Sequence, residues 1–275
     1  MLASKIGERN IWKDSSLEAS VNYIERVLIE LGYEVKEQEY VVDKKIVKNI
    51  EAEISGTSRE KEIIIVGAHY DSFKGSPGAN DNASGVAALL EIARVFTKEK
   101  PSRTVRFVAF VNEEEPFFQT INMGSRVYAE RVKGNDENIV AMLSLETIGY
   151  YSDEVDSQNY PFLLSFFYPK TGNFIGFVGN ISSRNLVHQT ISFFRSHTAF
   201  PSEGASAPGW ITGIDWSDHW SFWEEGYPAI MITDTALYRY KHYHKPQDTP
   251  DKLVYDRFAR VVLGITQTVK DLSGP

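Results

Sequence analysis

The run EIIIVGA at residues 62–68 has consecutive rather than alternating apolar residues, so both faces of the strand that it predicts would be buried. A second run of this kind, TVRFVAFV, follows at residues 104–111. Between the two runs, residues 84–96 have apolar side chains at helical spacing, among them Leu89 and Ala93. A buried strand, a helix and a second buried strand in this order predict parallel strands joined by a crossover helix, the repeating unit of α/β proteins.

The rest of the chain continues the alternation of helical and extended patterns. Further helices are predicted at residues 16–31, 125–132, 183–196, 217–225 and 251–272, and further strands at 33–42, 46–55, 140–148, 174–178 and 229–233. No internal repeat, low-complexity tract or linker divides the chain. We therefore expect an α/β fold: a single three-layer α/β/α domain over residues 1–275, whose mixed and mainly parallel central sheet is flanked by helices.

The composition excludes several classes of protein. The chain has 275 residues, of which 42% are hydrophobic, and this suffices for a substantial core and argues against disorder. Its net charge of -8 makes nucleic acid a poor candidate partner. Because there is no cysteine, disulfides and thiolate metal sites are excluded, and any zinc must be bound by histidine and carboxylate side chains.

Neither a membrane segment nor a signal peptide is predicted. No stretch reaches about 18 consecutive apolar residues, and the initial MLASK begins no apolar run of signal-peptide length. We expect a soluble protein, either cytoplasmic or exported with a leader already removed. The sequence does not predict its oligomeric state.

Three irregular stretches are rich in aromatic residues, glycine and proline: 113–124, 150–173 and 198–216. Loops that follow the carboxyl ends of strands build the ligand crevice of an α/β sheet, and long loops in a compact domain are usually functional. The side chains that carry the chemistry are therefore expected at this edge of the sheet.

The first buried strand runs directly into His69 and Asp71. On an extended segment, residues two apart share a face, so these two side chains can point the same way. Asp71 could then accept a hydrogen bond from the His69 ring and fix its tautomer, as carboxylates do for metal-binding imidazoles. An isolated HxD motif is more often a surface histidine followed by a turn aspartate, so the motif alone does not decide.

A glycine-rich loop, GSPGANDNASG at residues 75–85, opens the next helix. It lacks both GxGxxG and the lysine of a P-loop, so a phosphate cradle is not favoured. Its Asn, Asp and Ser residues are typical of a helix N-cap. Alternatively, the two carboxylate oxygens of Asp81 could bridge two cations, and the residues alone leave both interpretations open.

Two further strands end in carboxylates. The second buried strand is followed by Glu113, Glu114 and Glu115, which raise one another's pKa and are costly to bring together without a cation. A solvated acidic turn is the alternative. Glu146 lies within the apolar run LSLETI at residues 143–148, where a buried carboxylate needs either a metal or a salt bridge.

The remaining histidines give weaker signals. His242 and His244 form an HxH motif in the loop before the last helix, which suggests a metal only weakly. Asp218 stands beside His219, and either a place in the site or a capping role is open. Two histidines without acidic neighbours are expected at the surface: His188 and His197. No cysteine and no GxSxG elbow is present, which argues against a cysteine or serine hydrolase.

Taken in order, these motifs resemble those of the M28 family of zinc aminopeptidases. The matching runs are AHYDS (68–72), GANDNASG (78–85), FVNEEEPFF (110–118), MGS (123–125), SLETIGYYS (144–152), SDHWSFW (217–223) and YHKPQDTPDKL (243–253). The resemblance extends over residues 10–270. It implies a zinc-peptidase-like fold and a metallopeptidase of the exopeptidase class, which removes N-terminal residues from peptides with a free N-terminus.

The resemblance also implies a role for each site residue. The implied ligands of two Zn²⁺ ions per chain are His69 and Glu146 on one ion, Glu114 and His244 on the other, and Asp81 between them. Glu113 would be the general base for a water activated by the two ions, and Asp71 would orient His69. Tyr243 would donate a hydrogen bond to the developing oxyanion. A cis peptide bond would follow Asp81.

Three alternatives to a two-zinc aminopeptidase are open. A glutaminyl-peptide cyclotransferase shares the fold and most of these ligands but uses one zinc. A non-catalytic binding module of this fold would be expected to lack ligands, and an M20-like peptidase would have a second domain inserted. For the peptidase, aromatic side chains of the irregular stretches could line an apolar pocket or belong to the core: Phe117, Phe118, Tyr150, Tyr151, Phe166, Phe167, Trp210 and Trp216.

Overall fold

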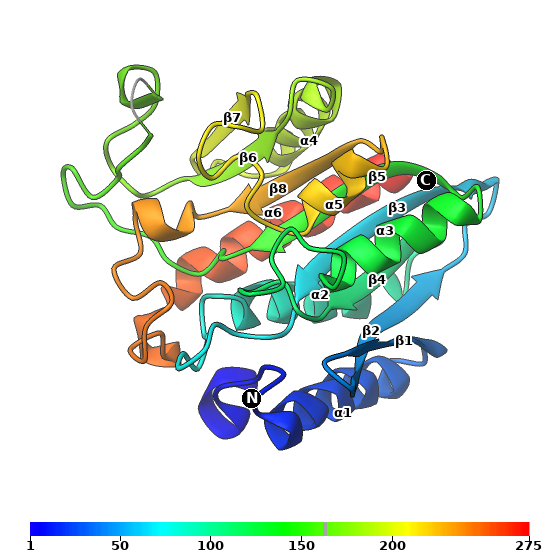
Figure 1. Cartoon of the computed structure of the whole chain (residues 1–275). Helices are drawn as coiled ribbons and strands as arrows, with labels where there is room; N and C mark the ends of the chain where they lie inside the picture. Colours follow the sequence, from blue (N-terminus) through cyan, green and yellow to red (C-terminus); the bar gives the residue numbers. More distant parts are fainter. Residues whose placement is uncertain (162–163, 275) are drawn as a thin grey trace.

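A single eight-stranded sheet runs through the molecule, with helices on both faces (Figure 1). The structure is a computed structural model, and it describes residues 1–161 and 164–274. The strands are β1 (Val35–Val42), β2 (Lys45–Ile54), β3 (Arg59–His69), β4 (Arg103–Phe110), β5 (Asn138–Glu146), β6 (Ile175–Gly179), β7 (Ser202–Ser206) and β8 (Ala229–Thr233). Their order across the sheet is β1-β2-β4-β3-β5-β8-β6-β7.

The helices divide between the two faces of the sheet. They are α1 (Asp14–Glu30), α2 (Ala83–Phe96), α3 (Gly124–Gly134), α4 (Arg184–His197), α5 (His219–Glu224) and α6 (Tyr255–Ser273). Apolar side chains of α1, α2, α4 and α6 join one buried cluster on one face, whereas those of α3 and α5 join a second cluster on the other. Short helical turns complete the chain at Leu2–Ile6, Leu164–Phe166, Ala236–Tyr238 and Pro250–Lys252.

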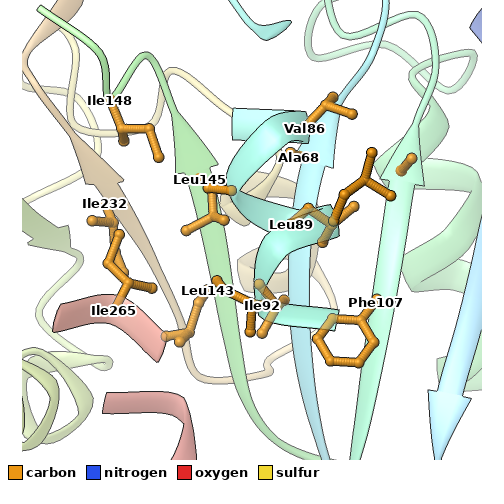
Figure 2. Packing of buried hydrophobic residues seen from close by; sticks show 14 of the residues in the cluster. Ala68, Val86, Leu89, Ile92, Phe107, Leu143, Leu145, Ile148, Ile232 and Ile265 are labelled. Atoms are coloured by element: carbon orange, nitrogen blue, oxygen red, sulfur yellow. The ribbon is translucent and has the colours of Figure 1, made fainter. Parts of the chain in front are cut away.

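The central strand β3 explains why its sequence is continuously apolar. Ile64 and Val66 pack into the cluster under α2, whereas Ile63 and Ile65 point to the opposite cluster under α3 and α5. Figure 2 shows the α2 side of this core, where Leu89 lies over the sheet. Each fully buried aliphatic side chain contributes about 1.5–3 kcal/mol, so both faces of β3 stabilise the fold.

The strand pairings confirm the expected mixed and mainly parallel sheet. β3 pairs in parallel with β4 and β5, and β5 with β8, so the carboxyl ends of the four central strands lie at one edge. β6 and β7 are parallel to each other, but β6 is antiparallel to β8. β2 is antiparallel to both β1 and β4. The α/β/α fold with its central sheet is thus as predicted.

Two elements differ from the sequence prediction. The strand Ser202–Ser206 (SEGAS) was not expected, because its small and polar residues have no apolar alternation and it forms as an edge strand by pairing with β6. The last helix was expected from residue 251, but a 3-10 turn at Pro250–Lys252 precedes α6, which begins at Tyr255. Among the described residues, no helix has the length and apolar character needed to cross a membrane.

Candidate metal centre

The five predicted metal ligands converge at the carboxyl edge of the sheet. His69 ends β3, Glu146 ends β5, and Glu114 follows β4 by a few residues. Asp81 comes from the loop that precedes α2, and His244 from the loop that precedes the last 3-10 turn. The sheet therefore supplies two of these side chains and loops supply the other three.

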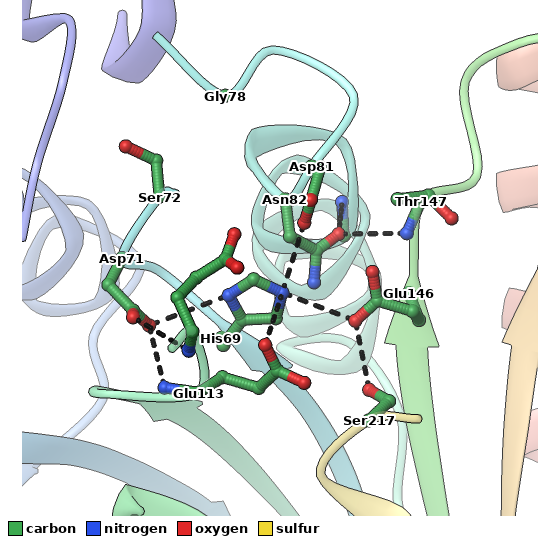
Figure 3. A network of polar contacts seen from close by, with 12 residues as sticks. His69, Asp71, Ser72, Gly78, Asp81, Asn82, Glu113, Glu146, Thr147 and Ser217 are labelled. Carbon is green, nitrogen blue, oxygen red and sulfur yellow. Dashed lines mark hydrogen bonds and ion pairs between the residues drawn. The ribbon is translucent and has the colours of Figure 1, made fainter. Parts of the chain in front are cut away.

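One half of the centre surrounds the Nε2 atom of His69. This atom lies 3.3 Å from Oδ1 of Asp81 and 3.2 Å from Oε2 of Glu146 (Figure 3). All three side chains are buried, and together they form a group with metal-ligand spacing.

The other half surrounds the Nε2 atom of His244. This atom lies 3.0 Å from Oδ2 of Asp81 and 3.1 Å from Oε2 of Glu114. Each carboxylate oxygen of Asp81 thus faces a different histidine. A carboxylate held in this way has the geometry needed to bridge two cations.

Several of these buried atoms have no hydrogen-bond partner within the described parts of the chain. They are both ring nitrogens of His69, Oδ2 of Asp81, Oε1 of Glu114 and Nε2 of His244. A buried polar atom without a partner is costly, and neutral imidazole with carboxylate is a donor set that suits Zn²⁺. The arrangement therefore fits zinc.

The electrostatics of the centre without a cation are unfavourable. Burial raises the pKa of Glu114 to about 8, and it also raises the pKa of Glu146. Burial alone would lower the pKa of His244, but the adjoining Asp81 and Glu114 raise it to about 11. A cation would allow the carboxylates to ionise together, because it replaces the protons that these shifts favour.

Asp71 holds the acidic turn in place beside His69. Its Oδ1 lies 3.5 Å from Nδ1 of His69, on the side of the ring away from Glu146 (Figure 3). The same carboxylate accepts hydrogen bonds from the backbone N–H groups of Glu113 and Glu114, both at 3.2 Å. Asp71 therefore orients both the imidazole and the segment that carries the two glutamates.

Glu113 lies beside the first half of the centre and forms a further group with metal-ligand spacing together with His69 and Glu114. Its Oε2 lies 3.8 Å from Nε2 of His69, farther than the carboxylates of Asp81 and Glu146. Burial raises the pKa of Glu113 well above its ordinary value, and nearby Glu146 and Glu114 add to the rise while His69 opposes it. A carboxyl group with a raised pKa is suited to accept and return a proton near neutral pH.

The loop carrying Asp81 is fixed by residues that the sequence did not identify. The peptide bond between Asp81 and Asn82 is cis, as the resemblance implied. Asp248 accepts hydrogen bonds from the backbone N–H groups of Asn80 at 2.8 Å and Asp81 at 3.1 Å. Asn82 accepts one from the N–H of Thr147 at 3.1 Å, which ties the loop to the end of β5.

Glu146 also has a neighbour that the sequence did not identify. The Ser217 hydroxyl donates a hydrogen bond of 2.9 Å to Oε2 of Glu146, the oxygen that faces His69 (Figure 3). Ser217 belongs to the SDHWSFW run, in which the sequence suggested only Asp218 and His219 as site residues. Of these, Asp218 is buried but accepts no capping hydrogen bond from α5, and the His219 ring contacts the carbonyl of Ile214 at 2.8 Å.

His244 is held by aromatic rings. Its imidazole stacks on Phe73, with ring centroids 4.1 Å apart, and on Tyr243, at 3.8 Å. Tyr243 also lines a cavity beside Glu146, which places its ring at the border between the centre and that cavity. The neighbouring His242 contacts Tyr240 instead.

Arg9 supports the loop between His69 and Asp81 through hydrogen bonds to its backbone. Its buried guanidinium donates hydrogen bonds to the carbonyls of Tyr70, Pro77 and Gly78, at 2.6, 2.5 and 2.7 Å. Burial lowers the pKa of Arg9 to about 10, although Asp71 and other nearby carboxylates act in the opposite direction. A lone arginine near the start of a chain gives no sequence signal for such a role.

A cavity of about 100 Å³ adjoins the centre. Among the aromatic residues predicted from the irregular stretches, only Trp216 lines it. Phe117 and Tyr151 are buried in the core, which was the other alternative, whereas the prediction is wrong for Phe166, Phe167 and Trp210, which are largely exposed. The aromatic lining comes instead from Tyr160, Tyr168, Phe174 and Tyr238.

The remaining predicted surface residues lie as expected. Glu115 is exposed, so the acidic run contributes two buried carboxylates and one solvated carboxylate. His188 and His197 are exposed on α4, and His197 pairs with Asp271 at 2.8 Å.

Comparison with known sequences gives one family and several relatives. The profile of Peptidase family M28 matches residues 49–269. The chain is 40% identical to the uncharacterized protein YfbL of Escherichia coli (strain K12), over 96% of this chain and 83% of YfbL. It is 26% identical to a probable zinc metalloprotease of Leptosphaeria maculans, over 76% of this chain and 51% of that protein. It is 25% identical to the probable aminopeptidase YDR415C of Saccharomyces cerevisiae, over 77% of this chain and 54% of that protein. The chain thus spans about half the length of these two relatives.

Solved structures give a consistent picture. An aminopeptidase from Aneurinibacillus sp. strain AM-1 is 27% identical, with a TM-score of 0.64 over 84% of this chain and 49% of that one. The LapA aminopeptidase of Legionella pneumophila matches with a TM-score of 0.73 at 18% identity, over 99% of this chain and 69% of that chain. A glutaminyl cyclase of Fimbriiglobus ruber matches with a TM-score of 0.73 at 20% identity, over 98% of this chain and 91% of that chain. The last two likenesses concern the fold alone.

Proposed function

The chain belongs to peptidase family M28, a family of metal-dependent peptidases, and from this premise we propose that it is a two-zinc aminopeptidase. The observation that carries the proposal is the orientation of Asp81, whose two carboxylate oxygens face two different histidines. A centre for one cation would need only one of these pairings. The substrate class is peptides with a free N-terminus.

The proposed zinc ligands fall into two sets that share Asp81. His69 and Glu146 belong to the first set, and His244 and Glu114 belong to the second. Zinc bound there would supply a Lewis acid that polarises the scissile carbonyl and makes a water molecule more acidic. Asp71 and Ser217 would keep the ligands of the first set in position, through the contacts described above.

Glu113 is the proposed general base. It is buried next to the first set of ligands without belonging to it, so its carboxyl group is free to move a proton. It would take a proton from the attacking water and deliver it to the leaving amine. Tyr243, at the border of the cavity, would donate its phenolic hydrogen to the oxygen of the carbonyl under attack.

The buried carboxylates beside the cavity support the choice of an exopeptidase. The cavity begins at Glu146 and Tyr243 and is bounded by the segments around Tyr160 and Thr212. A first residue could place its side chain in this cavity and its α-amine among the carboxylates of Glu113 and Glu146. The acidic surroundings would stabilise the ammonium form of that amine.

The test combines metal content with product analysis. The chain, saturated with zinc and freed of excess metal, would be assayed with aminoacyl-4-nitroanilides and with peptides that begin with glutamine. We expect two zinc ions per chain by mass spectrometry and release of the free first amino acid. One zinc per chain with formation of pyroglutamate would contradict the proposal and would favour a glutaminyl cyclase, a fold relative of the chain.

Glu113→Gln tests the base. The variant should lose about 10²–10⁴-fold in kcat while keeping the same zinc content, because the amide cannot accept the proton. Glu115→Gln is the matched control, since this neighbouring side chain is exposed, and it should retain full activity. Full activity of Glu113→Gln would show that the base lies elsewhere.

A further inference from the structure

Four residues form one row across the sheet, from the metal centre to the far edge strand. Glu146 of β5 pairs with Thr233 of β8, Thr233 with Gly176 of β6, and Gly176 with Glu203 of β7. Paired residues of neighbouring strands point to the same face of a sheet. The row therefore begins with a proposed zinc ligand and ends with a second glutamate on the same face.

The neighbours of this row show which face it lies on. Phe177 packs against Phe194 of α4, and a side chain at Gly204 would meet Ile191 of the same helix. These positions alternate with Gly176 and Glu203, which line the cavity on the opposite face. Glu203 thus lines the cavity that adjoins the metal centre, and as a residue of the edge strand it also borders a second pocket beside α4.

The distance from Glu146 to Glu203 determines how long a substrate side chain must be to reach from one to the other. Strands lie about 4.8 Å apart, so three spacings separate Glu146 from Glu203 by roughly 14 Å. A lysine or arginine side chain reaches roughly 6–7 Å from its α-carbon, and an ion pair at its tip and an α-amine at the centre would each add about 3 Å. A shorter side chain would leave Glu203 uncontacted.

The walls of the cavity suit the aliphatic part of such a side chain. Gly176 leaves the middle of the floor without a side chain, and Val178, Met231 and Ala205 cover the floor beside it. Tyr160 and Tyr168 lie close to Glu203, with their ring centroids 5.9 Å apart. Aromatic faces beside a carboxylate favour a cation with an apolar stem.

The Glu203 carboxylate forms no ion pair among the described residues, although Arg195 lies close enough to influence it. In the described residues it has neither a hydrogen-bond donor nor a cation within 4.0 Å. The nearby Arg195 instead donates to the hydroxyl and the carbonyl of Ser202. Burial raises the pKa of Glu203, and Arg195 opposes this rise. A half-buried carboxylate without a hydrogen-bond partner among the described residues, in a cavity with no basic side chain in its described lining, has the properties of a binding group for a cation.

We propose that Glu203 binds the cationic tip of the first residue's side chain and makes the enzyme selective for N-terminal arginine and lysine. The inference rests on the proposed aminopeptidase function, because it takes the α-amine end of the substrate to lie at Glu146. It adds that the far end of the cavity selects by charge as well as by size.

The test compares side chains of equal length and different charge. Arginine- and citrulline-4-nitroanilide have nearly the same shape, but only the first carries a charge, and leucine-4-nitroanilide is too short to reach Glu203. We expect kcat/KM to be at least about 10-fold higher for arginine than for citrulline. In Glu203→Gln this ratio should fall to near one, whereas turnover of the leucine substrate should stay within about twofold.

Glu60→Gln is the matched control variant. It removes the same charge from an exposed position at the opposite end of β3, so the arginine-to-citrulline ratio should remain as in the wild type. A loss of selectivity in both variants would attribute it to net charge and would overturn the role of Glu203.

A binding measurement separates this inference from the proposed function. Calorimetry with free L-arginine and L-citrulline on the zinc-loaded chain should show about 10-fold tighter binding of arginine, and Glu203→Gln should abolish the difference. Equal binding and equal cleavage of both would overturn the inference while the aminopeptidase stands. If arginine binds selectively but no anilide is cleaved, the proposed function fails and the cation site is retained.

Discussion

The two halves of the candidate metal centre are built differently although they share Asp81. The first half lies on the ends of the central strands β3 and β5, where His69 is 1% exposed and Glu146 is 6% exposed. The second half lies on loops, and its His244 is 26% exposed. One half is thus part of the core, and in the other half Glu114 is buried while His244 is partly exposed.

The supports of the two halves also differ. The first half is fixed by polar contacts, since Asp71 lies beside His69 and Ser217 donates to Glu146. In the second half, His244 is held between aromatic rings. Polar contacts on rigid strands define an orientation more strictly than stacking on a loop does. We therefore expect the first half to bind its ion more tightly and the second half to exchange its ion more easily.

Asp81→Asn should have the largest effect on activity and zinc content, because Asp81 is the residue that both halves share. The amide has only one oxygen, and its NH₂ group cannot bind a cation, so it cannot offer one oxygen to each ion. We expect kcat/KM to fall by about 10³-fold, and zinc content to fall from two ions toward one. Asp256→Asn, an exposed position in α6, is the control and should keep both values. Two tightly bound ions in Asp81→Asn would contradict the bridging role.

His69→Ala and His244→Ala compare the halves directly. In zinc-free protein, the first variant should lower the free energy of unfolding by about 2–4 kcal/mol, because it leaves a cavity and unpaired carboxylates in the core. The second should cost less, about 1–2 kcal/mol, because its site is partly solvated although Asp81 and Glu114 also lose a partner. Urea unfolding measures both. Equal losses would show that the halves do not differ in rigidity.

Zinc-free protein should become less stable as pH rises. Burial raises the pKa of Glu114 from 4.5 to about 8 and that of Asp218 from 3.8 to about 7, so the folded chain binds more protons than the unfolded chain. The stability from these groups is complete below about pH 4 and is lost as pH rises toward 8. Calorimetry should show Tm falling by more than about 5 °C between about pH 5 and pH 8.

Zinc should remove this dependence on pH, because the cation replaces the protons. The difference in Tm between zinc-loaded and zinc-free protein should therefore increase with pH. A zinc-free Tm that is constant or rises over this range would contradict the raised pKa values of the buried carboxyl groups.

Ser217→Ala should have the smallest effect and should act on one half only. Loss of the hydroxyl donor to Glu146 should weaken the tighter zinc site by about 10-fold and leave the weaker site unchanged. Competition with a chelator of known affinity measures both sites. Ser221→Ala, which removes another buried serine hydroxyl of the same segment, is the control. A change in the weaker site alone would reverse our assignment of the halves.

The sequence predicted the parts of the molecule whose patterns are local. Continuous apolar runs identified β3 and β4, and helical spacing identified α2 between them. The five proposed ligands became identifiable through the resemblance, because each stands in a short motif. In the structure they lie together, as that resemblance implied.

The residues that the sequence did not identify act through contacts with distant parts of the chain. Arg9 binds three carbonyls more than 60 positions away, and no motif surrounds it. Asp248 was interpreted only as part of a helix-start signal, although its carboxylate holds the backbone of Asp81. The sequence did not identify Tyr160 and Tyr168 as part of the cavity lining for the same reason, since their positions are set by tertiary packing.

The hydrogen bond from the backbone of Asp81 to Asp248 joins residues 167 positions apart. During synthesis on the ribosome, His69 and Asp81 therefore emerge long before the residues that complete and support their site. Until the segment of His244 and Asp248 has emerged, the nascent chain has only part of a metal centre. The proposed activity therefore becomes possible only after the segment of His244 and Asp248 has been made.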